Sequence, residues 1–195
     1  MKHSKKVWYA PNKHEAYGEE EIKAVEQCLR DGWLAGFGPR SVEFEEKIAK
    51  EFGKKYGVFV NSGSSACLLS LAALDLPKGT KVLTPALTFS TTLAPIIQLG
   101  YVPVFIDSNL TSYVPDIDDI IEAITDDIKV IMIPNLIGNK PDWKRLKDEL
   151  FRLNRSDIYL IEDSADTVTY TKESDVSTTS FYASHVITAG GMGGM

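Results

Sequence analysis

The sequence is poor in cysteine, in positive charge and in long apolar runs. Its two cysteines, Cys28 and Cys67, belong to no CxxC or Cys/His pair, so we expect reduced thiols and no zinc, iron–sulfur or other metal site. The longest apolar stretch, residues 68–76, is too short and interrupted to span a bilayer. The basic start MKHSKK is not followed by the apolar run of a signal peptide. We therefore expect a cytoplasmic protein with no membrane partner.

Basic residues are outnumbered, with 21 Lys and Arg against 27 Asp and Glu and a net charge of -6. This balance argues against nucleic acid as the main partner, because binding a phosphate backbone needs a basic face. The composition, 44% hydrophobic and 25% charged, is that of a folded chain and excludes disorder as the default. A chain of this length can bury one core of good size.

Two segments near the N-terminus predict helices. EEIKAVEQCLRDG repeats apolar residues at helical spacing and ends on a glycine that suits a C-terminal stop. SVEFEEKIAKEFG places apolar residues at steps of four, which again defines one helical face. We interpret residues 1–35 as an N-terminal helical segment and residues 36–195 as one large domain.

From residue 58 onward, short apolar runs alternate with helical stretches. The predicted strands are GVFVN, KVLTP, VPVFID, KVIMIPN and IYLIED, followed by STTSFYAS as one more strand. The predicted helices between them are SSACLLSLAAL, FSTTLAPIIQL, DIDDIIEAI and DWKRLKDELFRL. Strands that are apolar throughout are buried on both faces by crossover helices. The pattern predicts an α/β three-layer sandwich with a mostly parallel sheet and right-handed crossovers.

Ligands of such sheets bind at the carboxyl ends of the strands, so the polar residues there are the candidates for a site. In NSGSSA, Ser64 and Ser65 lie at the start of a helix, whose free N–H groups and dipole favour a phosphate. The alternative is a plain serine N-cap. Asn135 and Asn139, in NLIGN, either orient a substrate or satisfy the loop backbone, and the second interpretation is favoured.

Three further residues carry possible chemistry. Asp163, at a strand end in LIEDSAD, could pair with a cationic ring nitrogen, or instead cap a loop or bind a metal. Phe89 could stack on a flat ring, although a core position is favoured for it. His185 is the usual kind of side chain for moving a proton near neutral pH, or it is a simple loop residue.

The motifs NSGSSA, LTPALTFSTTLAPIIQLGYVPVFID, IEDSAD and SFYASH, in this order and at these distances, resemble the DegT/DnrJ/EryC1/StrS family of sugar aminotransferases. These are fold type I enzymes that use pyridoxal 5'-phosphate or pyridoxamine 5'-phosphate. The resemblance implies that residues 36–195 form an incomplete large domain of the aspartate aminotransferase fold. It also implies that a small C-terminal domain, present in the family, is absent from this chain.

The resemblance assigns a role to each matching position. Ser64, Ser65 and Ser180 would hold the cofactor phosphate. Phe89 would stack on the pyridine ring, and Asp163 would pair with its nitrogen. Asp166 stands where the family usually has Gln or His, near the phenolic oxygen of the cofactor.

Five residues after Ser180, where the family has the lysine of its internal Schiff base, this sequence has His185. Histidine cannot form a stable imine. SFYASHVITAGG and NLIGN are similar to one branch, the 3-dehydratases of nucleotide-linked 4-keto-6-deoxyhexoses. There the resemblance implies that the cofactor amine condenses with the C4 ketone, that His185 removes a proton from the C4′ carbon of the cofactor, and that the C3 hydroxyl leaves.

The resemblance therefore implies a lyase of deoxysugar biosynthesis, such as that of lipopolysaccharide O-antigen. A nucleotide-linked keto sugar is the expected substrate and a homodimer the expected assembly. A reductase partner, or a companion chain with the C-terminal part, is a further expected partner. Two alternatives stay open. One is a sugar aminotransferase with a displaced lysine, and the other is a non-catalytic truncated homologue or assembly partner.

Overall fold

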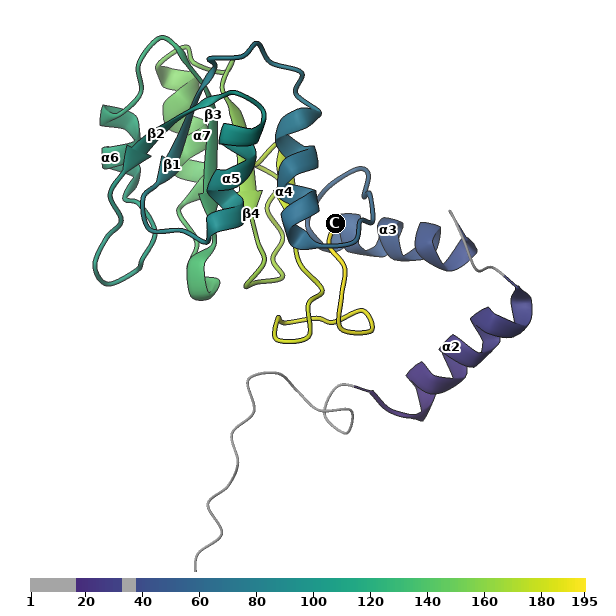
Figure 1. Cartoon of the computed structure of the whole chain (residues 1–195). Helices are drawn as coiled ribbons and strands as arrows, with labels where there is room; N and C mark the ends of the chain where they lie inside the picture. Colours follow the sequence, from purple (N-terminus) through teal and green to yellow (C-terminus); the bar gives the residue numbers. More distant parts are fainter. Residues whose placement is uncertain (1–16, 33–37) are drawn as a thin grey trace, which may run out of the picture.

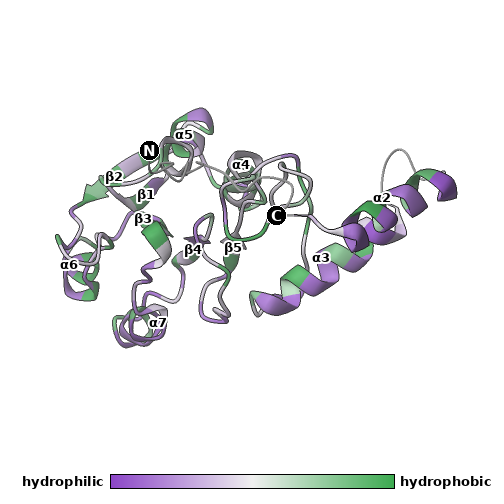
Figure 2. Cartoon of the chain, turned by 90° about the horizontal axis from the view of Figure 1, so that it is seen from below, coloured by the Kyte–Doolittle hydropathy of each residue, from purple (hydrophilic) through white to green (hydrophobic). Residues whose placement is uncertain are grey.

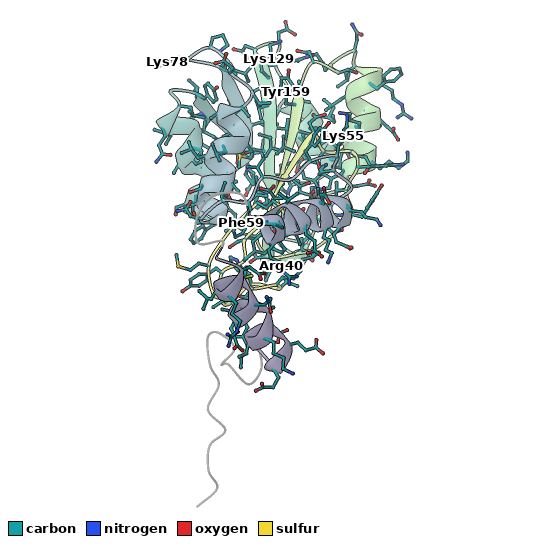
Figure 3. All side chains as sticks on the ribbon, turned by 90° about the vertical axis from the view of Figure 1, so that its right-hand side faces the viewer. Arg40, Lys55, Phe59, Lys78, Lys129 and Tyr159 are labelled. Carbon is teal, nitrogen blue, oxygen red and sulfur yellow. The ribbon has the colours of Figure 1, made fainter. Side chains whose placement is uncertain are left out.

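The computed structural model describes residues 17–32 and 38–195. At its centre is a parallel five-stranded sheet in the order β2-β1-β3-β4-β5. The strands are β1 (Lys81–Pro85), β2 (Val102–Ile106), β3 (Ile128–Pro134), β4 (Tyr159–Asp163) and β5 (Val176–Thr178). Lys129 and Tyr159, near the starts of β3 and β4, lie at the far end of the sheet from Phe59 (Figure 3).

Helices cover both faces of the sheet, which confirms the predicted three-layer α/β sandwich. Figure 2 shows α4 (Gly63–Ala72) and α5 (Ser90–Gln98) on one face, with α6 (Ile117–Glu122) and α7 (Trp143–Arg152) on the other. A short 3₁₀ turn, η1 (Leu136–Gly138), follows β3. In the described ranges, no helix has the length and apolar character needed to cross a membrane.

Two apolar clusters explain why the sequences of these strands are apolar at successive positions. Side chains alternate between the faces of a strand. On one face Leu83 and Ile131 pack with Leu146 and Leu150 of α7. On the opposite face Val82, Val130, Met132 and Ile161 pack with Leu71 of α4 and Ile96 of α5. Because both faces are covered, each strand needs apolar residues at successive positions.

The two predicted N-terminal helices are present as α2 (Glu19–Asp31) and α3 (Pro39–Glu51) (Figure 1). As predicted, α2 stops at Gly32, which takes the left-handed conformation with φ of 76°. The apolar face of α3 packs through Phe44 against Phe59 and Phe181, with ring centroids 5.4 and 4.9 Å away. The predicted boundary between residues 35 and 36 lies outside the described residues and stays a prediction.

The prediction of a strand at GVFVN is wrong. Within residues 57–61 only Val60 is paired, in a single antiparallel bridge to Gly194. The predicted strand STTSFYAS is also misplaced, because β5 covers only Val176–Thr178. Beyond Thr178 the backbone leaves β4, and the N–H of Thr179 donates to the carbonyl of Met195 at 2.9 Å. The two errors meet at residues 193–195, which pair with Val60 and with Thr179 and Ser180.

Candidate functional site

A cavity of about 490 Å³ opens at the carboxyl ends of the strands. It lies beside the switch point of the sheet, where β1 is flanked by β2 on one side and β3 on the other. The cavity brings six of the seven predicted site residues together. They are Ser64, Phe89, Asp163, Asp166, Ser180 and His185. Ser65 does not line it and faces an adjacent hollow, which Ser64 also lines.

The N-terminus of α4 forms one wall of the cavity. Its capping residue is Ser62, whose Oγ accepts the N–H of Ser65 at 3.1 Å. Neither Ser64 nor Ser65 is therefore the cap. The N–H groups of Gly63 and Ser64, in the first turn, have no acceptor among the described residues. An anion at this point would meet two free backbone donors and the positive end of the helix dipole.

Ser180 closes this wall from the other side, and only a glycine allows its approach. A Cβ built on Gly63 would lie 2.8 Å from the Cβ of Ser180, closer than carbon atoms can pack. The hydroxyl of Ser180 accepts the N–H of Tyr182 at 3.3 Å and also lines the cavity. The missing side chain of Gly63 in NSGSSA thus leaves the space that Ser180 occupies, 117 positions later in the chain.

Asp163 ends β4 and faces the cavity from its floor, with only 8% of its surface exposed. Its Oδ2 accepts the hydroxyl of Thr92 at 2.7 Å, and its Oδ1 accepts the N–H of Ala165 at 3.3 Å. Burial raises the pKa of Asp163, and the hydrogen bond from Thr92 opposes that rise. The described residues contain no cluster that could hold a metal ion, so the metal alternative for Asp163 finds no support in them.

Phe89 precedes α5 as its capping residue and is 69% exposed at the cavity. The favoured interpretation of Phe89 as a core residue is therefore wrong. An exposed aromatic ring on the wall of a cavity is a surface on which a flat ligand can stack.

His185 lies in the loop after β5 and lines the same cavity. Its backbone N–H donates to the carbonyl of Tyr182 at 2.9 Å, and the Tyr182 ring stands edge-on at 6.0 Å between centroids. The Nδ1 atom of the imidazole is buried without a hydrogen-bond partner. No lysine lines the cavity in the part of the chain that the structure describes. Among the described side chains that line the cavity, the imidazole of His185 is thus the one nitrogen base.

Asp166 lies at the rim, where it is exposed and accepts the N–H of Ile137 through Oδ2 at 3.1 Å. This bond holds the 3₁₀ turn of NLIGN, in which Ile137 takes a left-handed φ of 54°. Asn139 is exposed after that turn. The carboxylate of Asp166, in the segment after β4, therefore supports the NLIGN loop. The sequence pattern does not indicate this contact.

Asn135 is among the residues that line the cavity, and the polar atoms of its side chain all form hydrogen bonds within the protein. Its Nδ2 donates to Oε1 of Glu162 at 2.6 Å and to Oγ of Ser164 at 2.7 Å, and its Oδ1 accepts from Trp143. Glu162 is completely buried and also accepts the hydroxyls of Thr171 at 2.9 Å and Ser177 at 2.7 Å. The side chain of Asn135 satisfies the carboxylate that neighbours Asp163, rather than the loop backbone or a substrate.

Sequence reasoning missed Thr92, Cys67 and Tyr182, all of which line the cavity. The thiol of Cys67 lies 3.4 Å from the Thr178 hydroxyl, and burial raises its pKa. A signal for Thr92 exists in hindsight, because it is the one polar residue among those that α5 buries, beside Pro95 and Ile96. Cys67 and Tyr182 stand in apolar or loop contexts that carry no such signal.

A family model described as the DegT/DnrJ/EryC1/StrS aminotransferase family matches residues 15–195. Among curated relatives, the lipopolysaccharide biosynthesis protein RfbH of Salmonella typhimurium is 34% identical over 195 residues, covering 92% of this chain and 44% of the relative. The GDP-4-keto-6-deoxy-D-mannose 3-dehydratase of Escherichia coli O55:H7 is 34% identical, covering 88% of this chain and 47% of that protein. The chain spans about half the length of the relatives it matches.

Solved structures of the same kind share the fold. The E. coli GDP-4-keto-6-deoxy-D-mannose-3-dehydratase with bound hydrated PLP matches with a TM-score of 0.84 at 31% identity, covering 98% of this chain and 51% of that one. The PLP form of the putative sugar aminotransferase Spr1654 from Streptococcus pneumoniae matches with a TM-score of 0.82 at 27% identity, over 96% and 52%. The fold expected for PLP-dependent aminotransferases is thereby confirmed.

Proposed function

The chain belongs to the DegT/DnrJ/EryC1/StrS aminotransferase family, and from this premise we propose that it carries the cofactor site of a pyridoxamine 5'-phosphate-dependent 3-dehydratase. The proposed substrate is a nucleotide-linked 4-keto-6-deoxyhexose, a class to which the names of two relatives point, and the reaction removes its C3 hydroxyl. We place it in cytoplasmic deoxysugar biosynthesis. We propose a homodimer as its assembly, and a companion chain with the C-terminal part or a reductase as its partner.

Two features of the cavity fit this cofactor. The first is the cradle of Gly63, Ser64 and Ser180, in which free N–H groups and hydroxyls line one wall of the cavity and Gly63 allows Ser180 to approach α4 closely. The second is the buried and unpartnered Nδ1 of His185 on the wall of the same cavity. A polar atom left without a partner in a folded chain points to a ligand or a proton that it serves.

When bound, pyridoxamine 5'-phosphate supplies a primary amine that condenses with the keto group and a pyridinium ring that accepts electrons. The N–H groups of Gly63 and Ser64 and the hydroxyls of Ser64 and Ser180 bind the phosphate in this proposal, with Ser65 in the same helical turn. Asp163 holds the proton on the ring nitrogen, since a buried carboxylate stabilises a cation strongly. Phe89 covers one face of the ring, and Asp166 orients the phenolic oxygen.

His185 takes the proton from the C4′ carbon of the cofactor in this proposal, and the imidazole then donates it to the departing hydroxyl. The observation that carries the proposal is that His185, at the position where the resemblance to the family leads us to expect lysine, lines a cavity that no lysine of the described residues lines. A lysine would capture the aldehyde form of the cofactor and favour amino transfer. Histidine leaves the cofactor free to act as the amine.

The experiment places a lysine back at this position. Wild-type chain and His185→Lys are each incubated with pyridoxal 5'-phosphate, reduced with borohydride and weighed by mass spectrometry. We expect a covalent adduct with His185→Lys, mapped to residue 185, and none at a specific site in wild type. A single specific adduct in the wild-type chain would instead favour the sugar aminotransferase alternative with a displaced lysine.

A second measurement addresses the non-catalytic alternative. The chain is loaded with pyridoxamine 5'-phosphate, dialysed, and examined for cofactor absorbance, and then mixed with GDP-4-keto-6-deoxymannose. We expect retained absorbance, together with loss of water from the sugar in wild type but not in His185→Asn. Complete loss of absorbance on dialysis would favour a non-catalytic homologue, and unchanged dehydration by His185→Asn would remove His185 as the base.

A further inference from the structure

The NLIGN loop, residues 135–139, borders the candidate site in a strained conformation. Asn135 and Leu136 line the cavity, and the next residue, Ile137, takes a left-handed φ of 54°. A β-branched residue rarely adopts this conformation, and it persists only where the surrounding contacts hold it. The contacts that hold the loop therefore shape this wall of the cavity.

The two ends of the loop meet at one oxygen atom. At its start, Nδ2 of Asn135 donates to Oε1 of Glu162 at 2.6 Å. Just after its end, Nζ of Lys140 donates to Oγ1 of Thr171 at 2.9 Å, and this hydroxyl donates to the same Oε1 at 2.9 Å. An ammonium group only donates and a carboxylate only accepts, so the direction of both bonds at Thr171 is fixed. These four side chains thus close a ring of hydrogen bonds, the loop ring, with the backbone of residues 135–140.

Thr171 is a firm anchor for the loop ring. It is only 1% exposed, its N–H donates to the carbonyl of Phe52 at 3.2 Å, and its carbonyl accepts Nζ of Lys54 at 2.6 Å. Every polar group of Thr171 is therefore bound. Lys140, in contrast, is exposed and donates in addition to Oγ1 of Thr169 at 2.7 Å. Its ammonium group can be removed without opening the core.

We propose that Lys140 and Thr171 are positioning residues of the candidate site, which hold the NLIGN loop in its strained conformation through Glu162. A loop fixed only at Asn135 and at the N–H of Ile137 could relax, because movement of residues 138–140 would let Ile137 leave the left-handed region. The bond from Lys140 to Thr171 removes that freedom, since it ties the second end of the loop to the carboxylate that already holds the first.

The consequence for the site rests on the proposed function. Oδ2 of Asp166 accepts the N–H of Ile137 at 3.1 Å, so relaxation of the loop also frees this carboxylate. Asp166 is the residue proposed to orient the phenolic oxygen of the cofactor, and Leu136 lines the same cavity. We therefore expect the loop ring to strengthen cofactor binding, although neither Lys140 nor Thr171 lines the cavity.

The loop ring is tested first in the chain without cofactor. Lys140→Met removes the ammonium group and keeps an apolar stem, and at this exposed position it should leave the unfolding temperature nearly unchanged. NMR follows amide hydrogen exchange at Ile137 and the coupling between its amide and Hα protons, which reports φ. We expect exchange at Ile137 to become roughly tenfold faster or more and the coupling to change. Exchange and coupling equal to those of wild type would overturn the proposal.

Two further variants separate the loop ring from a general effect. Lys144→Met is the matched control, since it removes an exposed lysine that pairs with Asp148 within α7, and it should leave Ile137 unchanged. Thr171→Val removes the link itself, so Lys140→Met should have little further effect when it is added to this variant. Equally fast exchange in Lys144→Met, or additive effects in the double variant, would overturn the assignment to Lys140 and Thr171.

The affinity for pyridoxamine 5'-phosphate, titrated by absorbance, tests the consequence for the site. We expect Lys140→Met to bind the cofactor roughly three- to tenfold more weakly than wild type and Lys144→Met to bind it equally well. Faster exchange at Ile137 with unchanged affinity would overturn the role of Lys140 in the site. Absence of binding by wild type would instead overturn the proposed function, and exchange at Ile137 would still decide whether the loop ring holds the loop.

Discussion

The hydroxyl of Thr92 donates a 2.7 Å hydrogen bond to Oδ2 of Asp163, across the cleft between α5 and the end of β4. Both side chains are buried, so neither can exchange this bond for one to bulk water. Thr178 lies 3.5 Å from the other carboxylate oxygen. Thr92 therefore fixes the direction in which Asp163 faces the cavity and favours its charged form against the effect of burial.

Replacing Thr92 by valine removes the donor and keeps the shape of the side chain. We expect the pKa of Asp163 to rise further, because a hydrogen bond to the charged form is lost. Hydrogen bonds to charged groups contribute about 1.5–3 kcal/mol, so the affinity for pyridoxamine 5'-phosphate should fall by roughly tenfold or more. Titration followed by cofactor absorbance measures this change. Ser90→Ala, an exposed position on the same helix that does not line the cavity, is the control, and an equal loss in both variants would contradict a specific role for Thr92.

Asp163→Asn should stabilise the chain in the absence of cofactor at neutral pH. Burial raises the pKa of Asp163, so the folded state binds this proton more tightly than the unfolded state. The resulting stability is present below an unfolded pKa of about 4 and is lost as the pH rises through the raised folded value. Thermal unfolding of both chains from acidic to neutral pH should show the advantage of the variant growing with pH.

Asp163→Asn should also bind the cofactor more weakly, because it lacks the negative charge proposed to pair with the ring nitrogen. Added pyridoxamine 5'-phosphate is expected to raise the unfolding temperature of wild type more than that of Asp163→Asn. An Asp163→Asn chain that is less stable than wild type at neutral pH, without cofactor, would contradict the burial argument.

Gly63→Ala tests the close approach of Ser180 to α4. The new Cβ would meet the Cβ of Ser180 at 2.8 Å, so we expect a loss of stability of about 1–3 kcal/mol from overpacking, measured by urea unfolding. The double variant Gly63→Ala with Ser180→Gly removes the opposing Cβ and should recover part of that loss. Additive losses in the double variant would show that the two residues do not press on each other.

Glu162→Gln tests the buried network behind the cavity. Glu162 accepts hydrogen bonds from Asn135, Thr171 and Ser177. The side-chain amide of a glutamine would place an NH₂ group, itself a donor, opposite some of these donors, so that their hydrogen bonds could not form. We expect a loss of about 1–3 kcal/mol in the free energy of unfolding, the usual penalty for an unsatisfied buried group. Asp157→Asn, at an exposed ion pair with Lys129, should change stability far less. Similar losses in both variants would contradict the special role of burial.

The parallel sheet could be predicted because each of its central strands is apolar at successive positions, a pattern set by local residues alone. GVFVN has the same composition, yet it is no strand of the sheet, since its partner is a glycine-rich segment more than 130 positions away. Strand formation depends on what lies alongside, and no local pattern encodes that. The run STTSFYAS failed because the chain leaves β4 after Thr178 and pairs with residues 193–195 instead.

The candidate site divides in a similar way. Ser64, Phe89, Asp163, Ser180 and His185 could be predicted because they follow apolar runs at the strand ends or match family motifs. Thr92 and the partners of Glu162 could not, because their roles arise only when α5, β4 and the 171–177 loop pack together. Ser65 shows the limit of residue-level reasoning, since the helix begins at Gly63, one position earlier than predicted, and Ser65 lines the neighbouring hollow.

The wall of the cavity formed by Gly63 and Ser180 has a consequence for synthesis of the chain. A ribosome releases residues in order, and domains fold as their segments emerge. Strands β1 to β4 and their covering helices are complete once residue 163 is available, so both apolar clusters can assemble first. The loop with Ser180 and His185 is synthesised after them and packs against a helix made more than a hundred residues earlier. The sheet and the helices that support the site are thus synthesised before Ser180 and His185.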